Sequence, residues 1–153
     1  MKDSLEIDER IISFFKLHTN LTLAVSENDS PYCANCFYSF AEKKNLLIFK
    51  SNLDTTHISI ALKNDKVAGT IIPDSLDKIR IQGVQFTGKI SQAKEDDLTT
   101  AKNSYYKKYP FAIAFAGELW TIELHSIKFT DNKFGFGKKL LWSKDGVPLS
   151  SEK

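Results

Sequence analysis

Many of the motifs that indicate a specific chemistry are absent from this sequence. Its three histidines, His18, His57 and His125, are scattered and show no H-x-x-x-H spacing, so they do not predict a metal centre. There is no G-x-G-x-x-G motif and no Walker loop, and GFGKK near the C-terminus has the wrong glycine spacing for one. The sequence therefore predicts neither a metal site nor a common nucleotide-binding loop.

Long hydrophobic runs and a strong charge imbalance are also absent. No window approaches the unbroken apolar length that spans a membrane. The formal net charge of +2 is too small to argue for a nucleic-acid partner without a clustered basic patch. The first ten residues, MKDSLEIDER, carry four acidic side chains and do not resemble a signal peptide. We therefore expect a cytoplasmic protein without a membrane partner.

Cysteine is scarce. Cys33 and Cys36 are the only two and form a C-x-x-C within PYCANCFYSF. Redox or zinc chemistry would need a helix start beneath the pair or a second pair of ligands. The surrounding apolar and aromatic residues instead predict a strand, on which positions i and i+3 face opposite sides. We therefore expect two buried, reduced cysteines that bind no metal.

What the sequence does contain is typical of one globular domain. Its 153 residues are 42% hydrophobic and 26% charged, with eleven Phe, five Tyr and two Trp to fill a core. We expect a single domain over residues 1–144 and a short C-terminal tail over 145–153.

Periodicity predicts three helices among short strands. An apolar face that includes Leu5, Ile11 and Phe15 predicts a helix over 4–18, with Asp3 and Glu6 as a capping pair. Two further helices are predicted at about 55–63 and from residue 95 until Pro110 stops it. Strands are predicted over 21–27, 32–40, 46–51, 66–73 and 78–92, followed by a final hairpin that turns at TDNKFG.

Two long strands change their apolar face midway. In KIRIQGVQFTGKISQ, Ile79 and Ile81 share one parity and Val84 and Phe86 the other, which predicts a bulge at Gln82-Gly83. The strand that begins near Trp120 changes parity in the same way across His125-Ser126. Such strands predict a sheet that curls and closes: a mainly β, six- to seven-stranded antiparallel barrel with about three flanking helices.

The segment SNLDTTHISIAL is one candidate site. A helix start offers unpaired N–H groups, and donors surround it at Ser51, Thr55, Thr56 and His57, which favours an anion. The alternative interpretation is that Asp54 or Thr55 simply caps the helix.

The run Gln82-Gly83-Val84-Gln85 is the second candidate. A bulge frees backbone N–H and C=O groups, and the two glutamines add donor–acceptor pairs that could read the edge of a flat heterocycle. The alternative is that the bulge only turns a barrel corner while the glutamines are solvated.

The order of elements and several local motifs resemble a known superfamily. The run NLLIFKSNLDTTHISIALKNDKVAGTI, then IRIQGVQFTGKI, an acidic-start helix and a final hairpin are similar to the FMN-binding split barrel of the pyridoxamine phosphate oxidase-like superfamily. CANCFY, GVQFTG and IKFTDNKFGFGKK resemble the YhbP-like bacterial branch of it. The likeness covers residues 5–142 and is specific for the branch.

The resemblance implies a set of FMN-binding residues in a homodimer. The flavin phosphate would be held after the third strand by Lys50, Ser51, Thr55, Thr56 and His57, where Thr56 and His57 replace the usual Arg or Lys. The flavin ring would be lined by Asn35, Cys36, Phe37 and Tyr38, with Gln82, Gly83, Val84 and Gln85 near its edge. The C-terminal hairpin of the partner would contribute Phe136, Lys138, Lys139 and Trp142.

The resemblance thus implies a flavoprotein, with oxidoreductase chemistry carried out by FMN itself on an unidentified small molecule. Two alternatives stay open. One is a haem- or deazaflavin-binding barrel, for which a histidine would supply the axial ligand to haem. The other is a non-enzymatic module that binds single-stranded nucleic acid through a patch at Lys107, Lys108, Lys138 and Lys139.

Overall fold

The computed structural model describes residues 6–134 and 139–146, and within these ranges the mainly β class predicted above is confirmed. No helix in the described ranges has the length and apolar character needed to cross a membrane. The helices and strands are α1 Glu9–Leu17, β1 Asn20–Glu27, β2 Ser30–Ala41, β3 Leu46–Ser51, α2 Thr56–Lys63, β4 Lys66–Ile71, β5 Gln82–Gln92, α3 Glu95–Lys108, β6 Glu118–Asp131 and β7 Lys139–Ser143, with short 3-10 turns η2 Glu42–Lys44, η3 Pro110–Ala114 and η4 Asn132–Phe134.

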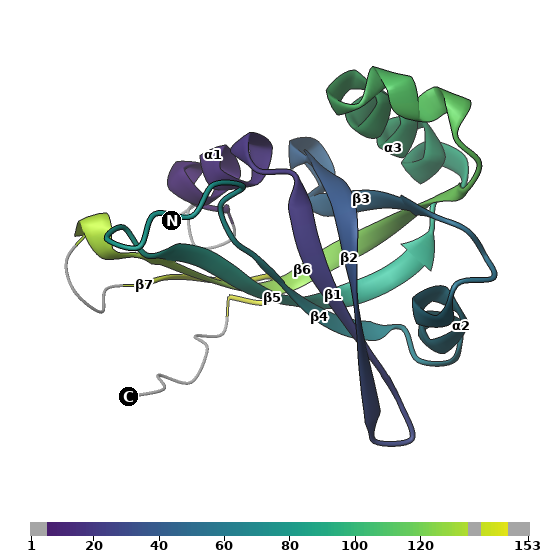
Figure 1. Cartoon of the computed structure of the whole chain (residues 1–153), viewed down its shortest axis with the longest axis horizontal. Helices are drawn as coiled ribbons and strands as arrows, with labels where there is room; N and C mark the ends of the chain where they lie inside the picture. Colours follow the sequence, from purple (N-terminus) through teal and green to yellow (C-terminus); the bar gives the residue numbers. More distant parts are fainter. Residues whose placement is uncertain (1–5, 135–138, 147–153) are drawn as a thin grey trace.

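The seven strands form one antiparallel sheet in the order β3-β2-β1-β4-β5-β6-β7. The sheet closes because β3 also pairs with the first half of β6, from Leu46↔Glu123 to Ser51↔Glu118. The second half of β6 pairs with β7 instead, which leaves β7 outside the closed part. Figure 1 shows the sheet with α1 and α3 above it, α2 below α3 at the right and the β1–β2 hairpin projecting downward beyond the body. Asn28 and Asp29, both at positive φ, make the tight turn of that hairpin.

The first helix is shorter than its sequence pattern predicts. It begins at Glu9, because Asp8 is the N-cap and its carboxylate accepts a hydrogen bond from the Arg10 N–H at 2.9 Å. Glu6 lies before the helix, and the expected partner Asp3 lies outside the described residues. The prediction of a helix over 4–18 was therefore wrong at its start. The other two helices agree with the prediction within about a turn.

Only one of the two predicted bulges exists. Thr87 pairs with Ser126 and Gly88 with Leu124, so His125 is the extra residue and the bulge at His125-Ser126 is confirmed. The bulge at Gln82-Gly83 is wrong, because pairing with β6 runs without a shift from Gln82 to Thr87. The change of parity has a simpler cause there: Ile79 and Ile81 precede β5 in an exposed segment and do not belong to the strand.

The interior is filled by large side chains from both sheet and helices. Phe14 and Phe15 of α1 pack into the barrel with Tyr38, Phe49 and Trp120. A second, smaller cluster lies under α3, where Tyr105 and Tyr109 pack on the β3 side of the sheet. Cys36 is part of the first core, whereas Cys33 is exposed on the projecting hairpin. The prediction that both cysteines are buried was thus wrong for Cys33. Among the described residues, no group of three His, Cys, Asp or Glu side chains lies close enough together to hold a metal ion.

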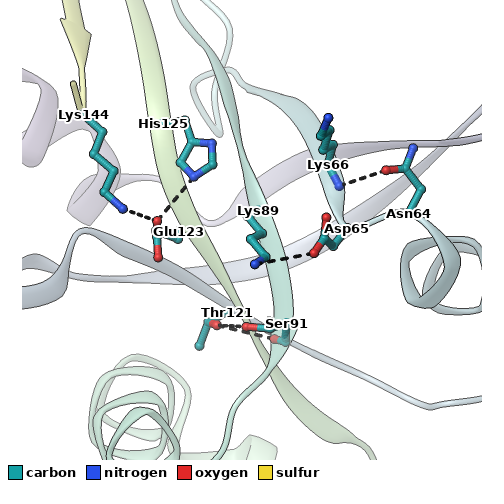
Figure 2. A network of polar contacts seen from close by, with 9 residues as sticks. All are labelled: Asn64, Asp65, Lys66, Lys89, Ser91, Thr121, Glu123, His125 and Lys144. Atoms are coloured by element: carbon teal, nitrogen blue, oxygen red, sulfur yellow. Dashed lines mark hydrogen bonds and ion pairs between the residues drawn. The ribbon is translucent and has the colours of Figure 1, made fainter. Parts of the chain in front are cut away.

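Polar contacts fasten the outer strands near the bulge. In Figure 2, His125 and Lys144 both point to the carboxylate of Glu123. The hydrogen bond and charge of Lys144, assisted by His125, hold the pKa of Glu123 below its usual range despite partial burial. The Lys144 N–H also donates to the His125 carbonyl at 2.8 Å, so the end of β7 is tied to the bulged part of β6.

Asp131 is a buried carboxylate at the other end of β6. It accepts hydrogen bonds from Arg80 at 3.1 Å, from the Gln82 amide at 2.9 Å and from the Lys133 N–H at 2.9 Å. Burial alone would raise its pKa, but these three donors outweigh it and the pKa is lowered. Asp131 therefore joins the exposed 72–81 segment to the start of β5 and the end of β6.

We expect Asp131 to make the fold sensitive to acid. Because its folded pKa is lowered, its contribution is present above the unfolded pKa of about 3.9 and is lost as the pH falls through the folded pKa. Urea unfolding from pH 7 to pH 3 should show a drop of about 1 kcal/mol from this group, because its unfolded form binds a proton below a pKa of about 3.9. Asp131→Asn should be less stable at pH 7 but lose less on acidification. An unchanged pH slope in this variant would contradict the assignment.

Candidate functional site

The barrel opens between β2 and β3. The two strands pair only from Tyr38↔Phe49 to Ala41↔Leu46. Beyond Phe49, β3 continues along β6 alone, while β2 from Ser30 to Phe37 continues along β1. The helix α2 starts just after β3 leaves the opening. The end of β3, the N-terminus of α2 and the unpaired edge of β2 border this place.

Three polar side chains meet at the α2 side of this opening. Ser51 Oγ lies 2.8 Å from His57 Nε2 and 3.3 Å from Thr55 Oγ1, and the Thr55 and His57 atoms are 3.4 Å apart. Thr55 is the N-cap of α2, and its hydroxyl accepts the Ile58 N–H at 3.4 Å. The capping interpretation of this segment is therefore confirmed for Thr55. We call Ser51, Thr55 and His57 the hydroxyl–imidazole cluster.

The surroundings of this cluster suit an anion better than a cation. Burial lowers the pKa of His57, which keeps its ring neutral near pH 7 unless a negative group approaches. Asp54 is exposed, so its carboxylate is in water and not in the protein interior. The buried Trp120 donates its indole N–H to the Ser51 carbonyl at 3.0 Å, which fixes the end of β3. The arrangement can offer hydroxyl, imidazole and helix N–H donors to one oxyanion.

Lys50 makes its hydrogen bonds to another part of the chain. Its ammonium donates to the Tyr106 hydroxyl at 3.0 Å, to the Ala112 carbonyl at 2.8 Å and to the Phe115 carbonyl at 2.5 Å. These contacts tie β3 to α3 and η3, and they use the three donors that a lysine has. The structure thus places Lys50, predicted as a phosphate ligand, in the support of the 110–116 segment.

Replacing Lys50 should loosen that segment. In Lys50→Met two backbone carbonyls and a hydroxyl lose their donor, and we expect a loss of about 2 kcal/mol in unfolding free energy. Chymotrypsin should then cut faster after the exposed Phe111 and Phe115. Lys102→Met, at an exposed position of α3, is the matched control. Equal cleavage rates in the two variants would show that Lys50 does not hold the segment.

A row of polar side chains crosses the exposed face of the sheet from the β2 side of the opening. The register aligns Asn35 with Thr22, Thr22 with Thr70, Thr70 with Gln85 and Gln85 with Lys128. The Thr22 hydroxyl donates to Asn35 Oδ1 at 2.9 Å. Part of this row forms the floor of a hollow of about 610 Å³, whose other wall includes Lys139 and Leu141 of β7. We call this region the sheet-face hollow.

The remaining predicted residues are distributed over three environments. Phe37 is 60% exposed beside the opening, whereas Cys36 and Tyr38 on the opposite face lie in the core, where burial raises the pKa of the Cys36 thiol to about 12. The Gln82 amide donates a hydrogen bond to Asp131, and of residues 82–85 only Gln85 lines the sheet-face hollow. Thr56 is exposed at the start of α2, Gly83 is half-buried and Val84 is buried.

The C-terminal hairpin is only partly described. Phe136 and Lys138, with the glycines Gly135 and Gly137, lie outside the described residues. Lys139 lines the sheet-face hollow. Trp142 is 6% exposed and belongs to the main core. A change of Trp142 to Ala is therefore expected to cost about 3–5 kcal/mol of stability, because it would leave a cavity among large side chains.

Sequence reasoning missed Thr22, Thr70 and Lys128, which share the row with Asn35 and Gln85. Each occupies the outward position of a strand whose inward neighbours are Leu, Ile, Phe or, beside Thr70, Gly69, so the alternation does predict that they face outward. Only the pairing register places them side by side, and no motif in the sequence encodes that register.

Comparison with known sequences identifies relatives. No family model matches the chain. The UPF0306 protein of Yersinia pestis bv. Antiqua (strain Angola) is 37% identical over 131 residues, which cover 86% of this chain and 89% of the relative. Identity at this level over most of both chains establishes common family membership.

Solved structures share the fold at low sequence identity. A heme binding protein from Mycobacterium smegmatis aligns with a TM-score of 0.70 and 13% identity over 85% of this chain, which spans only 55% of that protein's length. A FAD-binding protein from Mesorhizobium loti gives 0.64 and 12% identity over 82% of this chain and 94% of its own. A putative pyridoxamine 5'-phosphate oxidase from Listeria innocua gives 0.63 and 14% identity over 79% and 95%.

These similarities agree with the order of elements and the closure of β3 onto β6. The chain therefore belongs to the UPF0306 family, the YhbP-like branch that its sequence motifs resemble, and it shares the split-barrel fold of these solved structures.

Proposed function

We propose that this protein is a cytoplasmic FMN-binding flavoprotein that works as a homodimer, with an oxidoreductase activity on a small molecule. The observation that carries the proposal is the hydroxyl–imidazole cluster at the opening between β2 and β3. It offers donors for a phosphate where β3 parts from β2 and α2 begins.

The phosphate end of FMN fits the cluster chemically. Ser51, Thr55 and His57 are hydrogen-bonding groups, and the α2 N-terminus adds N–H groups and a favourable dipole. A bound phosphate would also favour the protonated form of His57. Positions 56 and 57 carry Thr and His, where the superfamily pattern has Arg or Lys. The phosphate site therefore holds less positive charge, and the affinity for FMN depends on the protonation of His57.

The flavin ring needs a flat surface with hydrogen-bonding groups at its edge. The sheet face next to the opening supplies the exposed ring of Phe37 and the amides of Asn35 and Gln85. This face is open, with small side chains such as Ala24 and Ala68 along the hollow. A second copy of the chain packed on this face would cover the ring, and Lys139 of β7 lies where it could complete such a site.

FMN supplies electron transfer by itself when it is bound, and the protein's part is to hold and tune it. The chain's residues bind the phosphate, present amides to the ring edge and exclude water through the second copy. This division of roles requires no acid–base constellation in the protein beyond the groups that hold the cofactor.

The test is direct. Protein purified from cells should show the visible absorption of bound flavin, and flavin-free protein should gain several degrees of thermal stability on addition of FMN. Riboflavin, which lacks the phosphate, should stabilise it much less. Size-exclusion chromatography with light scattering should give twice the chain mass. No shift at saturating FMN would refute the proposal.

Haem and deazaflavin are the alternatives that these experiments also address. Each of the three histidines already has a ring nitrogen in a hydrogen bond: His18 with the Asp74 N–H, His57 with Ser51 and His125 with Glu123. A haem ligand would have to break such a contact or use the other nitrogen. A Soret band on haem addition that disappears in one histidine variant would favour haem over FMN.

A further inference from the structure

The segment over residues 109–117, YPFAIAFAG, contains no charged side chain. It follows α3 and includes η3, and three of its large side chains lie at the surface of the single chain. Phe111 is 68% exposed, Ile113 is 67% exposed and Phe115 is 63% exposed. Single exposed apolar residues are common on proteins, but a contiguous apolar surface marks a contact with another molecule.

Phe37 of β2 extends this surface onto the sheet. Its ring centre lies 5.8 Å from that of the buried Tyr109, which lies 6.3 Å from that of Phe111. The rings of Phe111 and Phe115 are 6.4 Å apart in turn. Within β2, Phe37 faces outward like Asn35, since the residue between them is buried. One surface is thus formed by four side chains, which we call the apolar patch: Phe37, Phe111, Ile113 and Phe115.

The backbone beneath the patch is held by hydrogen bonds from other elements. The Lys50 ammonium donates to the carbonyls of Ala112 and Phe115. The Tyr109 hydroxyl donates to the Tyr38 carbonyl at 2.6 Å, which fixes the start of the segment to β2. Because this backbone is already fixed, little conformational entropy is lost when another molecule covers the patch.

The exposed area of the patch matches what a stable dimer needs. An exposed fraction of about two thirds leaves about 130 Å² of each large side chain uncovered, or about 500 Å² for the four together. A standard interface buries about 800 Å² per partner, and about 65% of a homodimer interface is apolar, which is also about 500 Å². The patch alone therefore supplies the apolar area of one such face.

A second group of exposed apolar side chains lies in the 72–81 segment, where Leu76 is 70% and Ile79 is 87% exposed. Four charged residues are interspersed with them: Asp74, Asp77, Lys78 and Arg80. The cores of protein interfaces are depleted in charged residues and enriched in aromatic ones, which describes the apolar patch and not the 72–81 segment. The 72–81 segment therefore serves as a comparison surface.

We propose that two copies of this chain associate through their apolar patches, related by a twofold axis. The inference rests on the homodimer of the proposed function and names the surface that holds it together. A second copy fits this surface because an uncharged face can meet its own image without placing like charges opposite each other. Because Phe37 lies beside Asn35 on the outward face of β2, the same contact brings the second copy to the end of the polar row.

Removal of two aromatic side chains from the patch should break the dimer. In Phe111→Ser with Phe115→Ser, we expect the dimer Kd to rise at least about a hundredfold, because each lost anchor occurs twice across the twofold axis. Leu76→Ser with Ile79→Ser is the matched control, which removes two equally exposed apolar side chains and should leave the Kd unchanged. Sedimentation velocity over a dilution series measures both. A patch variant that dimerises like the control would overturn the proposal, as would a wild-type chain that is monomeric throughout the series.

Footprinting of the unmodified protein gives a test that does not depend on how a variant folds. Hydroxyl radicals oxidise exposed aromatic and aliphatic side chains, and mass spectrometry of the peptides reports the oxidation of each. Oxidation of Phe111 and Phe115 should fall several-fold between the dilute monomer and the concentrated dimer, whereas oxidation of Leu76 and Ile79 should stay the same. Equal oxidation of the patch in monomer and dimer would mean that the two copies meet elsewhere.

Titration of the same samples with FMN keeps this contact apart from the cofactor. A dimer that depends on the patch but binds no FMN would refute flavin binding and leave the contact standing. FMN binding by a chain that is monomeric, or whose dimer survives the loss of Phe111 and Phe115, would overturn the contact and leave flavin binding in place.

Discussion

Removing the Ser51 hydroxyl and the His57 imidazole together should weaken FMN binding by at least two orders of magnitude and leave the barrel folded. Both groups belong to the hydroxyl–imidazole cluster, and each would donate to a phosphate that carries negative charge. Hydrogen bonds to charged groups contribute about 1.5–3 kcal/mol each, so the loss of two predicts about 3 kcal/mol or more, which exceeds a hundredfold in Kd. Thr55 is left in place because it caps α2 and its loss would confuse binding with stability.

The measurement is a titration of flavin-free protein with FMN, followed by quenching of flavin fluorescence. The double variant Ser59→Ala and His125→Ala is the matched control: Ser59 is an exposed residue of α2, and His125 lies on the outer bulge of β6. Wild type and control should bind alike, and all three proteins should have similar far-UV spectra and melting temperatures. An FMN affinity that is the same in both double variants would show that the phosphate binds elsewhere.

The pH dependence of binding gives an independent check on His57. Its pKa in the free protein is lowered by burial, and bound phosphate would raise it again, so binding takes up a proton. Affinity should therefore rise as the pH is lowered from 8 toward 6. His57→Gln, which keeps a donor but cannot titrate, should bind FMN with a flatter pH profile.

Gly88→Ala should destabilise the barrel far more than an alanine at another glycine of the same strand. A Cβ at Gly88 would lie 2.4 Å from the Glu123 carbonyl oxygen and 2.8 Å from Ile122 Cγ2, both on the neighbouring β6. Gly88 sits beside the bulge at which β6 changes partner, from β3 on one half to β7 on the other. The strands would have to separate there, because a backbone oxygen cannot rotate away as a side chain can.

We expect Gly88→Ala to lower the unfolding free energy by about 3 kcal/mol, equivalent to roughly 10 °C in Tm for a chain of this size. Gly83→Ala is the matched control on the same strand, since its Cβ would meet nothing closer than the Ile71 carbonyl oxygen at 3.6 Å. It should change stability by less than about 0.5 kcal/mol. Equal losses in the two variants, measured by urea unfolding, would mean that the bulge can shift to accept a side chain.

The pairing of β5 with β6 also explains why one predicted bulge was right and the other wrong. Both predictions used the same signal, a change in the parity of apolar residues. At His125-Ser126 the parity changes inside a continuous strand, and an extra residue is the only way to keep both halves facing the core. At Gln82-Gly83 the strand β5 only begins. Ile79 and Ile81, which precede it, are exposed and do not belong to a strand with a buried face.

The sequence alone was sufficient for the order and type of the main elements and for the class of fold, but not for all of their bounds. Strands such as Leu46–Ser51, and the acidic start and basic end of α3, follow from local alternation, capping and charge, which depend on neighbours a few residues away. The motifs around Thr55 and in GVQFTG pointed to the split barrel and to the hydroxyl–imidazole cluster. Local rules place these residues correctly because the cluster spans only Ser51 to His57.

Tertiary structure decided which predicted site residues lie together near the surface and which hold the fold. Lys50 and Gln82 look like free polar ligands in the sequence, yet long-range partners at Phe115 and Asp131 use their donors. Cys36 and Trp142 lie in the core because the register and the curl of the sheet turn them inward. The row from Asn35 to Lys128 joins residues far apart in the chain. Such contacts depend on strand register and barrel closure, and no local pattern in the sequence specifies either.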